Sequence, residues 1–177
     1  MTALAQALQQ VGIGTLRFNF PFIQTGKRWV DKPNVCISTI AKALATAQQL
    51  AEKVPLFVGG HSFGGRMSTH FAAEWAVDIN GVVCFSFPLH PHNKPSIDRA
   101  THLAKITIPQ LFLSGDRDPL ARKDLLSATL GPLPLATLHW LETANHSFKI
   151  LKRTRKSKED IYDEAARVTS HWLRSVC

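Results

Sequence analysis

A serine lies between two glycines in the stretch Gly60-His-Ser-Phe-Gly64, which is a G-x-S-x-G pattern. The apolar run Leu56–Val58 before it predicts a buried strand, and residues 63–77 after it are compatible with a helix. At a sharp turn between strand and helix, the hydroxyl of Ser62 would project above the sheet, where it could act as a nucleophile. We expect both glycines to be required, because a Cβ at either position would collide with the neighbouring strand or helix. The N–H groups at the start of the helix point at the same place and favour developing negative charge.

Two other predicted strand ends carry the partners that such a serine needs. Asp116 and Asp118 follow the apolar strand predicted at 106–113, and His146 follows the strand predicted at 136–141. In open α/β sheets, sites form at the carboxyl ends of the strands, so these side chains are expected to meet. A histidine can take the proton of a serine near neutral pH, and a carboxylate can hold the imidazole in the required tautomer. The residues alone leave open which of the two aspartates does this.

The elements that must position these side chains alternate along the chain. Helices are predicted at 2–11, 35–53, 63–77, 120–130 and 159–174, and strands at 15–20, 56–58, 81–87, 106–113 and 136–141. This alternation predicts an α/β fold with a mainly parallel sheet flanked by helices. The length suits a single domain that spans residues 1–177.

The composition is that of a globular protein. Hydrophobic residues make up 45% of the chain and charged residues 19%, and no apolar run approaches the ~20 residues of a membrane span. The start of the chain lacks the basic segment of a signal peptide. Three cysteines without metal-ligand spacing are typical of reduced thiols. We therefore expect a cytoplasmic location and no membrane partner.

The formal net charge of +8 has two interpretations. Much of the excess lies in the run Lys149–Lys158, which is typical of a solvated loop and helix start. The same run could attract an acidic partner. We do not expect nucleic acid as the partner, because that role would rest on net charge alone, without a recognised motif or aromatic platform.

Five stretches, in order, carry a family resemblance. They are Arg17–Pro21, Gly60–Met67, Phe87–Pro91, Leu111–Asp118 and Ala144–Phe148. Together they resemble the small α/β-hydrolases of the KANL3/Tex30 type, which are also described as dienelactone-hydrolase-like. The order serine, aspartate, histidine is also that of the α/β-hydrolase fold. The resemblance covers nearly the whole chain.

The resemblance implies a role for each candidate residue. Ser62 would be the nucleophile, His146 the base, and the backbone N–H of Phe63 one oxyanion donor. The family pattern G-x-x-D matches residues 115–118 and so selects Asp118 as the acid, which leaves Asp116 as a turn residue. The implied activity is hydrolysis of small-molecule ester-type substrates through a covalent acyl-enzyme, without a cofactor.

The chain departs from the family pattern at its start. Relatives are expected to open with a strand that ends in a His-Gly-Ala-Gly-like loop before the first helix, whereas Met1 already lies in that helix. The resemblance therefore implies an N-terminally truncated domain without its second oxyanion donor, and an esterase-like activity that is reduced accordingly. It also implies a slot between residues 15–20 and 56–58. We expect the chain to close this slot by pairing those two strands directly.

Further polar residues are candidates for lining the substrate pocket, and each has a structural alternative. Asn19 could touch substrate or cap a turn, and His61 could line the pocket or pack beside the serine turn. His90 could line the pocket; with His92 it suggests a metal site, but no third ligand is spaced with the pair, so we expect no metal. Arg66 could attract an anionic substrate or form a structural ion pair.

A second class of function stays open beside the enzyme. The same fold could serve as a non-catalytic interaction module that binds a protein partner, because some relatives are subunits of larger assemblies and a fold does not fix a function. The missing oxyanion loop and the basic run both favour this alternative. Serine reactivity distinguishes the two classes.

Overall fold

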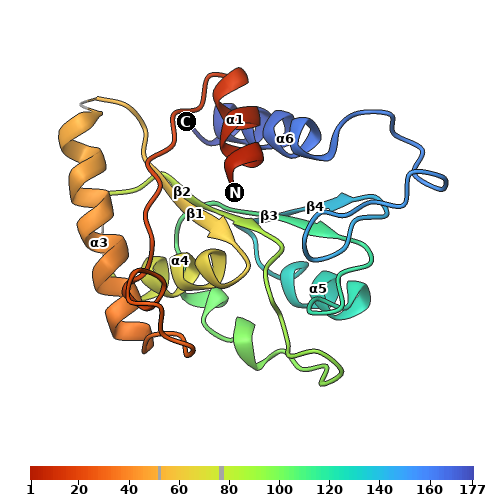
Figure 1. Ribbon diagram of the computed structural model, residues 1–177, viewed down its shortest axis with the longest axis horizontal. Coiled ribbons are helices and arrows are strands. Elements are labelled where there is room, and N and C mark those ends of the chain that lie inside the picture. The colour runs from red at the N-terminus through yellow and green to blue at the C-terminus, as the bar shows by residue number, and fades with distance from the viewer. Residues whose placement is uncertain (52, 76–77) are drawn as a thin grey trace.

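A parallel sheet of four strands forms the centre of the protein (Figure 1). The computed structural model describes residues 1–51, 53–75 and 78–177. Within them the strands are β1 (Phe57–His61), β2 (Gly81–Phe85), β3 (Gln110–Gly115) and β4 (Ala136–Leu141), adjacent in that order. His61 lies opposite Phe85, and Phe85 lies opposite Leu113. The carboxyl ends of the strands therefore meet at one edge of the sheet.

Helices cover both faces of the sheet (Figure 1). One face carries α1 (Thr2–Gln10) and α6 (Ile161–Val176), and the other carries α3 (Pro33–Leu50), α4 (Phe63–Glu74) and α5 (Lys123–Leu130). The short helix α2 (Pro21–Gln24) and the 3-10 turns η1 (Asp98–Ala100) and η2 (Leu103–Lys105) lie in the connections. None of the helices in the described ranges is long and apolar enough to cross a membrane.

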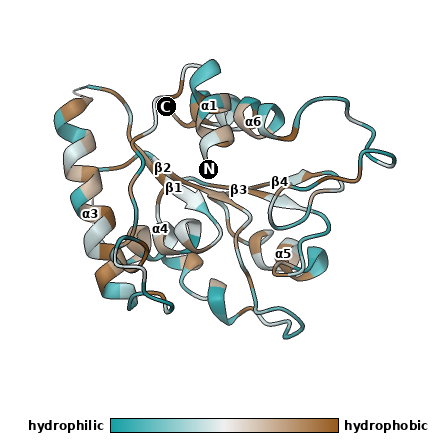
Figure 2. Cartoon of the chain, in the orientation of Figure 1, coloured by the Kyte–Doolittle hydropathy of each residue, from teal (hydrophilic) through white to brown (hydrophobic). Residues whose placement is uncertain are grey.

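The core has two layers, one on each side of the sheet. Val82 and Cys84 of β2 pack against the side of α3 and α4, while Val83 and Phe85 pack against the side of α1 and α6. All four side chains are buried. Figure 2 shows the strands as mostly hydrophobic and the loop before α6 as mostly hydrophilic. The continuous apolar strands are therefore explained by burial on both faces.

Most predicted elements are present with shifted ends. The third predicted helix ends at Glu74 in the structure; the final residues of that prediction, 76–77, lie outside the described residues. The strand predicted at 106–113 begins four residues later, at Gln110, and the helix predicted at 120–130 begins at Lys123. The strand predicted at 136–141 has the predicted bounds.

The strand predicted at 15–20 is wrong. In the part of the chain that the structure describes, residues 14–19 form no strand and make no backbone–backbone hydrogen bond. The segment is fixed at its two ends instead: Ile13 N–H donates to Leu8 O (3.0 Å), and the ring of Phe20 packs edge-on against Phe63 (5.5 Å between centroids). The expected direct pairing with the strand at 56–58 is therefore wrong as well.

Candidate active site

Ser62 occupies the turn between β1 and α4. Its backbone has φ 54° and ψ −118°, a conformation that costs a residue with a side chain about 1–3 kcal/mol. The surrounding structure holds it there. Ser62 N–H donates to Phe85 O of β2 (2.8 Å), and Ser62 O accepts from Arg66 N–H of α4 (3.0 Å). These bonds fix the turn to the sheet and to the helix.

The glycines around Ser62 differ from the expectation. A Cβ on Gly60 would lie 2.9 Å from the carbonyl carbon of Gly64, so Gly60 is required as predicted. A Cβ on Gly64 would meet nothing within 4 Å, so the predicted collision there is wrong. The tight position is Gly65, where a Cβ would lie 2.6 Å from Gly60 O. The first turn of α4 thus crosses β1 in direct backbone contact, which requires glycine at both Gly60 and Gly65.

Three side chains from separate loops form a hydrogen-bonded chain at the carboxyl edge of the sheet. Ser62 Oγ lies 2.7 Å from His146 Nε2, and His146 Nδ1 lies 2.7 Å from Asp118 Oδ2. A carboxylate only accepts hydrogen bonds, so Nδ1–H donates to Asp118 and Nε2 is the acceptor for the hydroxyl of Ser62. The serine hydroxyl therefore faces the lone pair of a histidine whose tautomer is fixed by the aspartate.

The loop after β3 holds Asp118 in place and keeps it from water. Its side chain is fully buried, and Oδ1 accepts from Leu120 N–H (2.8 Å). Asp118 N–H donates in turn to Gly115 O (3.1 Å). Gly115 also lets the His146 loop approach, because a Cβ there would lie 2.2 Å from Ala144 O. Asp116 is not in the chain of hydrogen bonds: its Oδ1 is buried and has no partner among the described residues.

His61 supports the loop that carries His146. Its Nε2–H donates to the backbone oxygen of His146 (2.7 Å), and the two rings lie 5.3 Å apart. Phe148 packs edge-on against the other side of the His61 ring (5.7 Å). Burial lowers the pKa of His61, so the ring stays neutral and acts as a donor to that oxygen. The structure thus places His61 between His146 and Phe148, where it bonds the backbone of the His146 loop.

The other two pocket candidates lie in different environments. His90 is 3% exposed; its Nδ1–H donates to Pro91 O (2.9 Å), and its Nε2 accepts from Arg122 N–H (3.0 Å). It therefore joins the loop after β2 to the loop after β3. Asn19 is exposed, in the extended segment next to β1. Across residues 1–51, 53–75 and 78–177, no group of three His, Cys, Asp or Glu side chains could hold a metal ion.

Two aromatic rings that the sequence interpretation did not single out surround the helix start. Phe20 packs edge-on against the ring of Phe63 at 5.5 Å, and Phe22 does so at 5.8 Å. Phe63 is the first residue of α4, and the first N–H groups of a helix have no acceptor within the helix. The spacing of Phe18, Phe20 and Phe22 was the available signal, but nothing in it indicated Phe63 as the partner.

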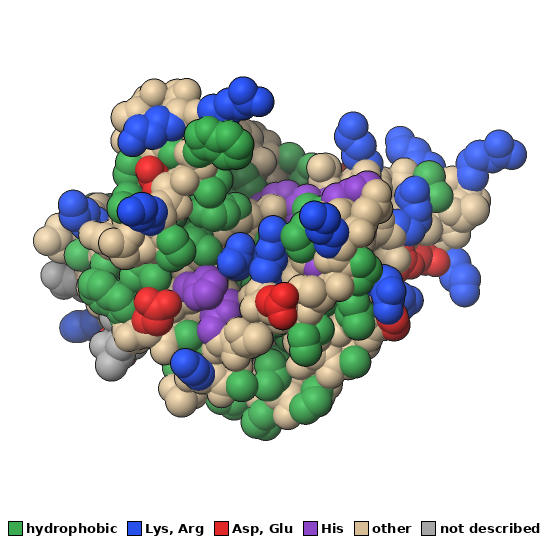
Figure 3. Space-filling model, turned by 90° about the horizontal axis from the view of Figure 1, so that it is seen from below, with side chains coloured by type: hydrophobic (Ala, Val, Ile, Leu, Met, Phe, Trp, Pro, Cys, Tyr) green, Lys and Arg blue, Asp and Glu red, His purple; other side chains and the backbone are tan. Residues whose placement is uncertain are grey.

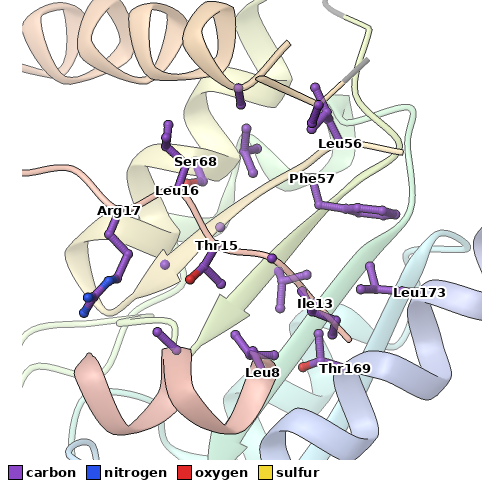
Figure 4. A pocket seen from close by; sticks show the side chains of 18 of the residues that line it. Leu8, Ile13, Thr15, Leu16, Arg17, Leu56, Phe57, Ser68, Thr169 and Leu173 are labelled. Atoms are coloured by element: carbon purple, nitrogen blue, oxygen red, sulfur yellow. The ribbon is translucent and has the colours of Figure 1, made fainter. Parts of the chain in front are cut away.

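A groove of about 690 Å³ separates β1 from the extended segment 12–18 (Figure 4). It is lined by Leu56 and Phe57 on the β1 side and by Ile13, Thr15 and Leu16 on the other. In the described chain, β1 pairs with β2 alone, so its other edge faces this groove. The slot expected between the two segments is therefore present and open.

The parallel sheet, the serine turn and the hydrogen-bonded serine, histidine and aspartate are the features of the α/β-hydrolase class. The family described as alpha/beta hydrolase domain matches residues 1–174, and the chain belongs to this family.

Similar solved structures share the fold. One is an alpha-beta serine hydrolase homologue from Coxiella burnetii (17% identity, TM-score 0.70, 99% of this chain and 75% of that chain covered). Another is a monoacylglycerol lipase from Paleococcus ferrophilus (17%, 0.70, 98% and 88%). A third is Est1E from Butyrivibrio proteoclasticus with ferulic acid bound (15%, 0.72, 99% and 82%). The chain therefore has the α/β-hydrolase fold.

Proposed function

We propose that the protein is a serine hydrolase of carboxylic-ester-type substrates that acts through a covalent acyl-enzyme. The observation that carries this proposal is the hydrogen-bonded chain from Ser62 through His146 to Asp118, at 2.7 Å for each contact. The family and the lipase among the similar structures support the same class of reaction. The roles implied by the resemblance fit the geometry without rearrangement.

In the first half-reaction, Ser62 Oγ attacks the ester carbonyl carbon while its proton moves to His146 Nε2. The carbonyl oxygen becomes an oxyanion, which the backbone N–H of Phe63 at the start of α4 stabilises. The tetrahedral intermediate then collapses. The bond to the leaving alcohol breaks, and His146 returns the proton to that alcohol, so that an acyl group stays on Ser62.

In the second half-reaction, His146 takes a proton from water, whose oxygen attacks the acyl carbon. Collapse of this second intermediate breaks the bond to Ser62 Oγ and returns the proton to it. The product is a carboxylic acid. Asp118 stabilises the imidazolium in both halves, and its burial keeps this interaction strong. His61 acts as a positioning residue, since it bonds the backbone of His146 and not the reacting atoms.

The test is hydrolysis of p-nitrophenyl acetate by the protein and by Ser62→Ala. We expect an initial burst of p-nitrophenol close to one equivalent, and no burst in Ser62→Ala. A Ser127→Ala variant on α5 is the matched control, because Ser127 lies outside the site. Equal rates for the protein and for Ser62→Ala would show that Ser62 is not the nucleophile.

We also propose that the groove beside β1 is the place of one further strand, which precedes residue 1 in a longer form of the chain. The KANL3/Tex30 resemblance supports this, because it places a strand and an oxyanion loop there. The unpaired edge of β1 and the unpaired backbone of residues 14–19 within the described chain support it too, since one inserted strand could bond to both.

A second candidate function is non-catalytic binding of an acidic protein surface. The specific observation in its favour is the exposed part of the basic run: Lys149, Lys152, Arg153, Lys156 and Lys158 are exposed. Arg155 is buried instead and is paired with Glu164. A protein partner retained at low salt and released at high salt, without serine reactivity, would favour this candidate over the enzyme.

A cytoplasmic location is part of the proposal. Cys36, Cys84 and Cys177 are free thiols, and Cys36 and Cys84 are buried. Unpaired cysteines of this kind are typical of a reducing compartment.

A further inference from the structure

Arg66 on α4 has a half-buried guanidinium that has no side-chain partner among the described residues. Its Nε is buried and has no hydrogen-bond acceptor, and in the described ranges no carboxylate lies within ion-pair distance of the guanidinium. Burial lowers the pKa of Arg66, and the nearby positive charge of Arg99 lowers it further. A desolvated cation beside a second cation is costly unless an anion joins them. The structural ion pair considered from the sequence therefore does not account for Arg66.

Arg99 of η1 is the second cation. Its Nη1 donates weakly to Pro88 O, at 3.5 Å, in the loop that follows β2. The neighbouring acid, Asp98, accepts a hydrogen bond from Ser96 Oγ instead (3.0 Å), and no salt bridge of Asp98 or Arg99 occurs within the described residues. The positive charge of Arg99 acts on Arg66 and lowers its pKa, and the nearest acidic side chain in sequence, Asp98, bonds elsewhere.

Two histidines beside the arginines add little positive charge. The rings of His70 and His102 are stacked, with centroids 3.6 Å apart and an interplanar angle of 13°. Thr69 Oγ1 donates to Arg66 O (2.7 Å), so it accepts from His102 Nε2–H (2.8 Å). Burial, with His70 and Arg66 nearby, lowers the pKa of His102 to about 3. Near neutral pH the positive charge of this cluster therefore belongs to the arginines.

Among the described residues, one acidic side chain lies within ion-pair distance of the histidine stack. Glu74 is the acid beside it, 3.7 Å from His70 Nδ1, at the end of α4 away from Ser62. Figure 3 shows histidine side chains beside Lys and Arg side chains near the middle of one face, with acidic side chains on either side of this group. The two guanidinium groups are partly buried, which favours a bound anion.

The position of Arg66 relates this cluster to the reacting serine. Arg66 N–H donates to Ser62 O (3.0 Å), so the two residues are one helical turn apart. Long side chains on a helix point back toward its N-terminus, which places the Arg66 side chain toward the end of α4 that carries Ser62. Arg99 is tied to the loop after β2, which also leaves the carboxyl edge of the sheet.

We propose that Arg66 and Arg99 form a subsite for an anionic group, a carboxylate or a phosphate, carried by the substrate at a distance from the ester bond that Ser62 cleaves. This inference rests on the proposed function for the identity of the bond. Guanidinium groups suit both anions, because their parallel N–H donors match two oxygens of a carboxylate or phosphate. The subsite gives a preference for anionic over neutral esters.

The kinetic test compares p-nitrophenyl acetate, which is neutral, with mono-p-nitrophenyl succinate, which carries a free carboxylate. In Arg66→Gln and in Arg99→Gln, KM for the succinate ester should rise about tenfold or more, as expected for loss of a charge-assisted hydrogen bond. KM for the acetate ester should not change. Lys42→Gln, which removes an exposed charge from α3, is the control. Equal changes for both esters would overturn the subsite.

A binding test separates this proposal from the proposed function. In the Ser62→Ala background, calorimetry measures binding of succinate and of inorganic phosphate with and without Arg66→Gln. Arginine-dependent binding in this background, together with no esterase activity in the unmodified protein, would keep the subsite and reject the hydrolase. Esterase activity without arginine-dependent binding of either anion would keep the hydrolase and reject the subsite. The anion that binds more tightly identifies the group as carboxylate or phosphate, and circular dichroism checks that each variant is folded.

Discussion

Asp118 and Asp116 are two residues apart, yet their carboxylates have different surroundings. Asp118 reaches His146 Nδ1 at 2.7 Å and also accepts the N–H of Leu120. Asp116 Oδ1 is buried and has no partner in the portion of the chain described. Only the first can fix the tautomer of the imidazole, and this difference can be tested with a matched pair of variants.

We predict that Asp118→Asn lowers kcat for p-nitrophenyl acetate by about 10³–10⁴, because an amide at that position favours the wrong imidazole tautomer. Asp116→Asn should change kcat by no more than a few-fold, because it removes no hydrogen bond. Steady-state kinetics of the two variants, with thermal melts to verify folding, check this. Comparable losses in both variants would contradict the assignment of Asp118.

We predict that His102 makes stability depend on pH. Its pKa is lowered from 6.5 to about 3, chiefly by burial, so the unfolded chain takes up this proton at a higher pH than the folded chain. The free energy of unfolding should therefore be undiminished above pH 6.5 and fall as the pH decreases from 6.5 toward 3. The slope for one group is at most about 1.4 kcal/mol per pH unit, and partial exposure of the ring reduces it.

Urea midpoints at pH 7.5 and pH 5.5 measure this effect. The loss of stability between the two should be smaller in His102→Gln than in the unmodified protein. His171→Gln on the exposed side of α6 serves as the control and should leave the difference as it was. If His102→Gln and the unmodified protein lost the same stability, His102 would not be the group responsible.

The sequence indicates well which residues form the candidate site, but it predicts their local hydrogen-bond partners poorly. The positions of Ser62 and His146 follow from motifs at strand ends, and the structure brings them within hydrogen-bond distance. The contacts of His61 with His146 O and of His90 with Arg122 N–H could not be predicted, because these partners are backbone groups in loops far away in the sequence. Such contacts depend on loop conformation, which residue types do not determine.

At the element scale, the crossing of β1 and α4 depends on Gly65. We predict that Gly65→Ala destabilises the protein by about 1–3 kcal/mol, because its Cβ would lie 2.6 Å from Gly60 O and backbone atoms must move. Gly64→Ala is the matched control: its Cβ meets nothing within 4 Å, and the lower flexibility of alanine could add up to about 1 kcal/mol.

Urea unfolding followed by circular dichroism compares the two glycine variants. The expected order of midpoints is Gly65→Ala lowest and Gly64→Ala at or above the unmodified protein. A Gly65→Ala variant as stable as Gly64→Ala would mean that β1 and α4 are not in direct backbone contact.

The prediction of residues 15–20 as a strand shows the limit of pattern reading for elements. Leu16, Phe18 and Phe20 alternate with other residues, as in a strand. Alternation describes which side chains can share a face, but a strand also needs a backbone partner at about 5 Å. In the described part of the chain, residues 14–19 have no such backbone partner, and Leu16 and Phe18 remain 45% and 42% exposed.

At the scale of the whole molecule, the groove beside β1 is the main departure from a closed α/β core. We predict that a longer form, with an apolar strand and loop before residue 1, unfolds at a higher urea concentration and hydrolyses p-nitrophenyl acetate faster. Each apolar side chain that such a strand buries contributes about 1.5–3 kcal/mol, and a second oxyanion donor typically adds about 10²–10³ in rate. Equal midpoints and equal rates in the two forms would show that the groove needs no strand.

The role of Ser62 as the nucleophile can be measured by covalent labelling. A fluorophosphonate probe forms a covalent adduct with a serine that an adjacent histidine activates. Incubation of the 177-residue protein with this probe, followed by intact-mass and peptide mass spectrometry, should give one adduct per chain, located on Ser62. The Ser62→Ala variant should give none. An adduct on another residue, or equal labelling of both proteins, would contradict the assignment of Ser62 as the nucleophile.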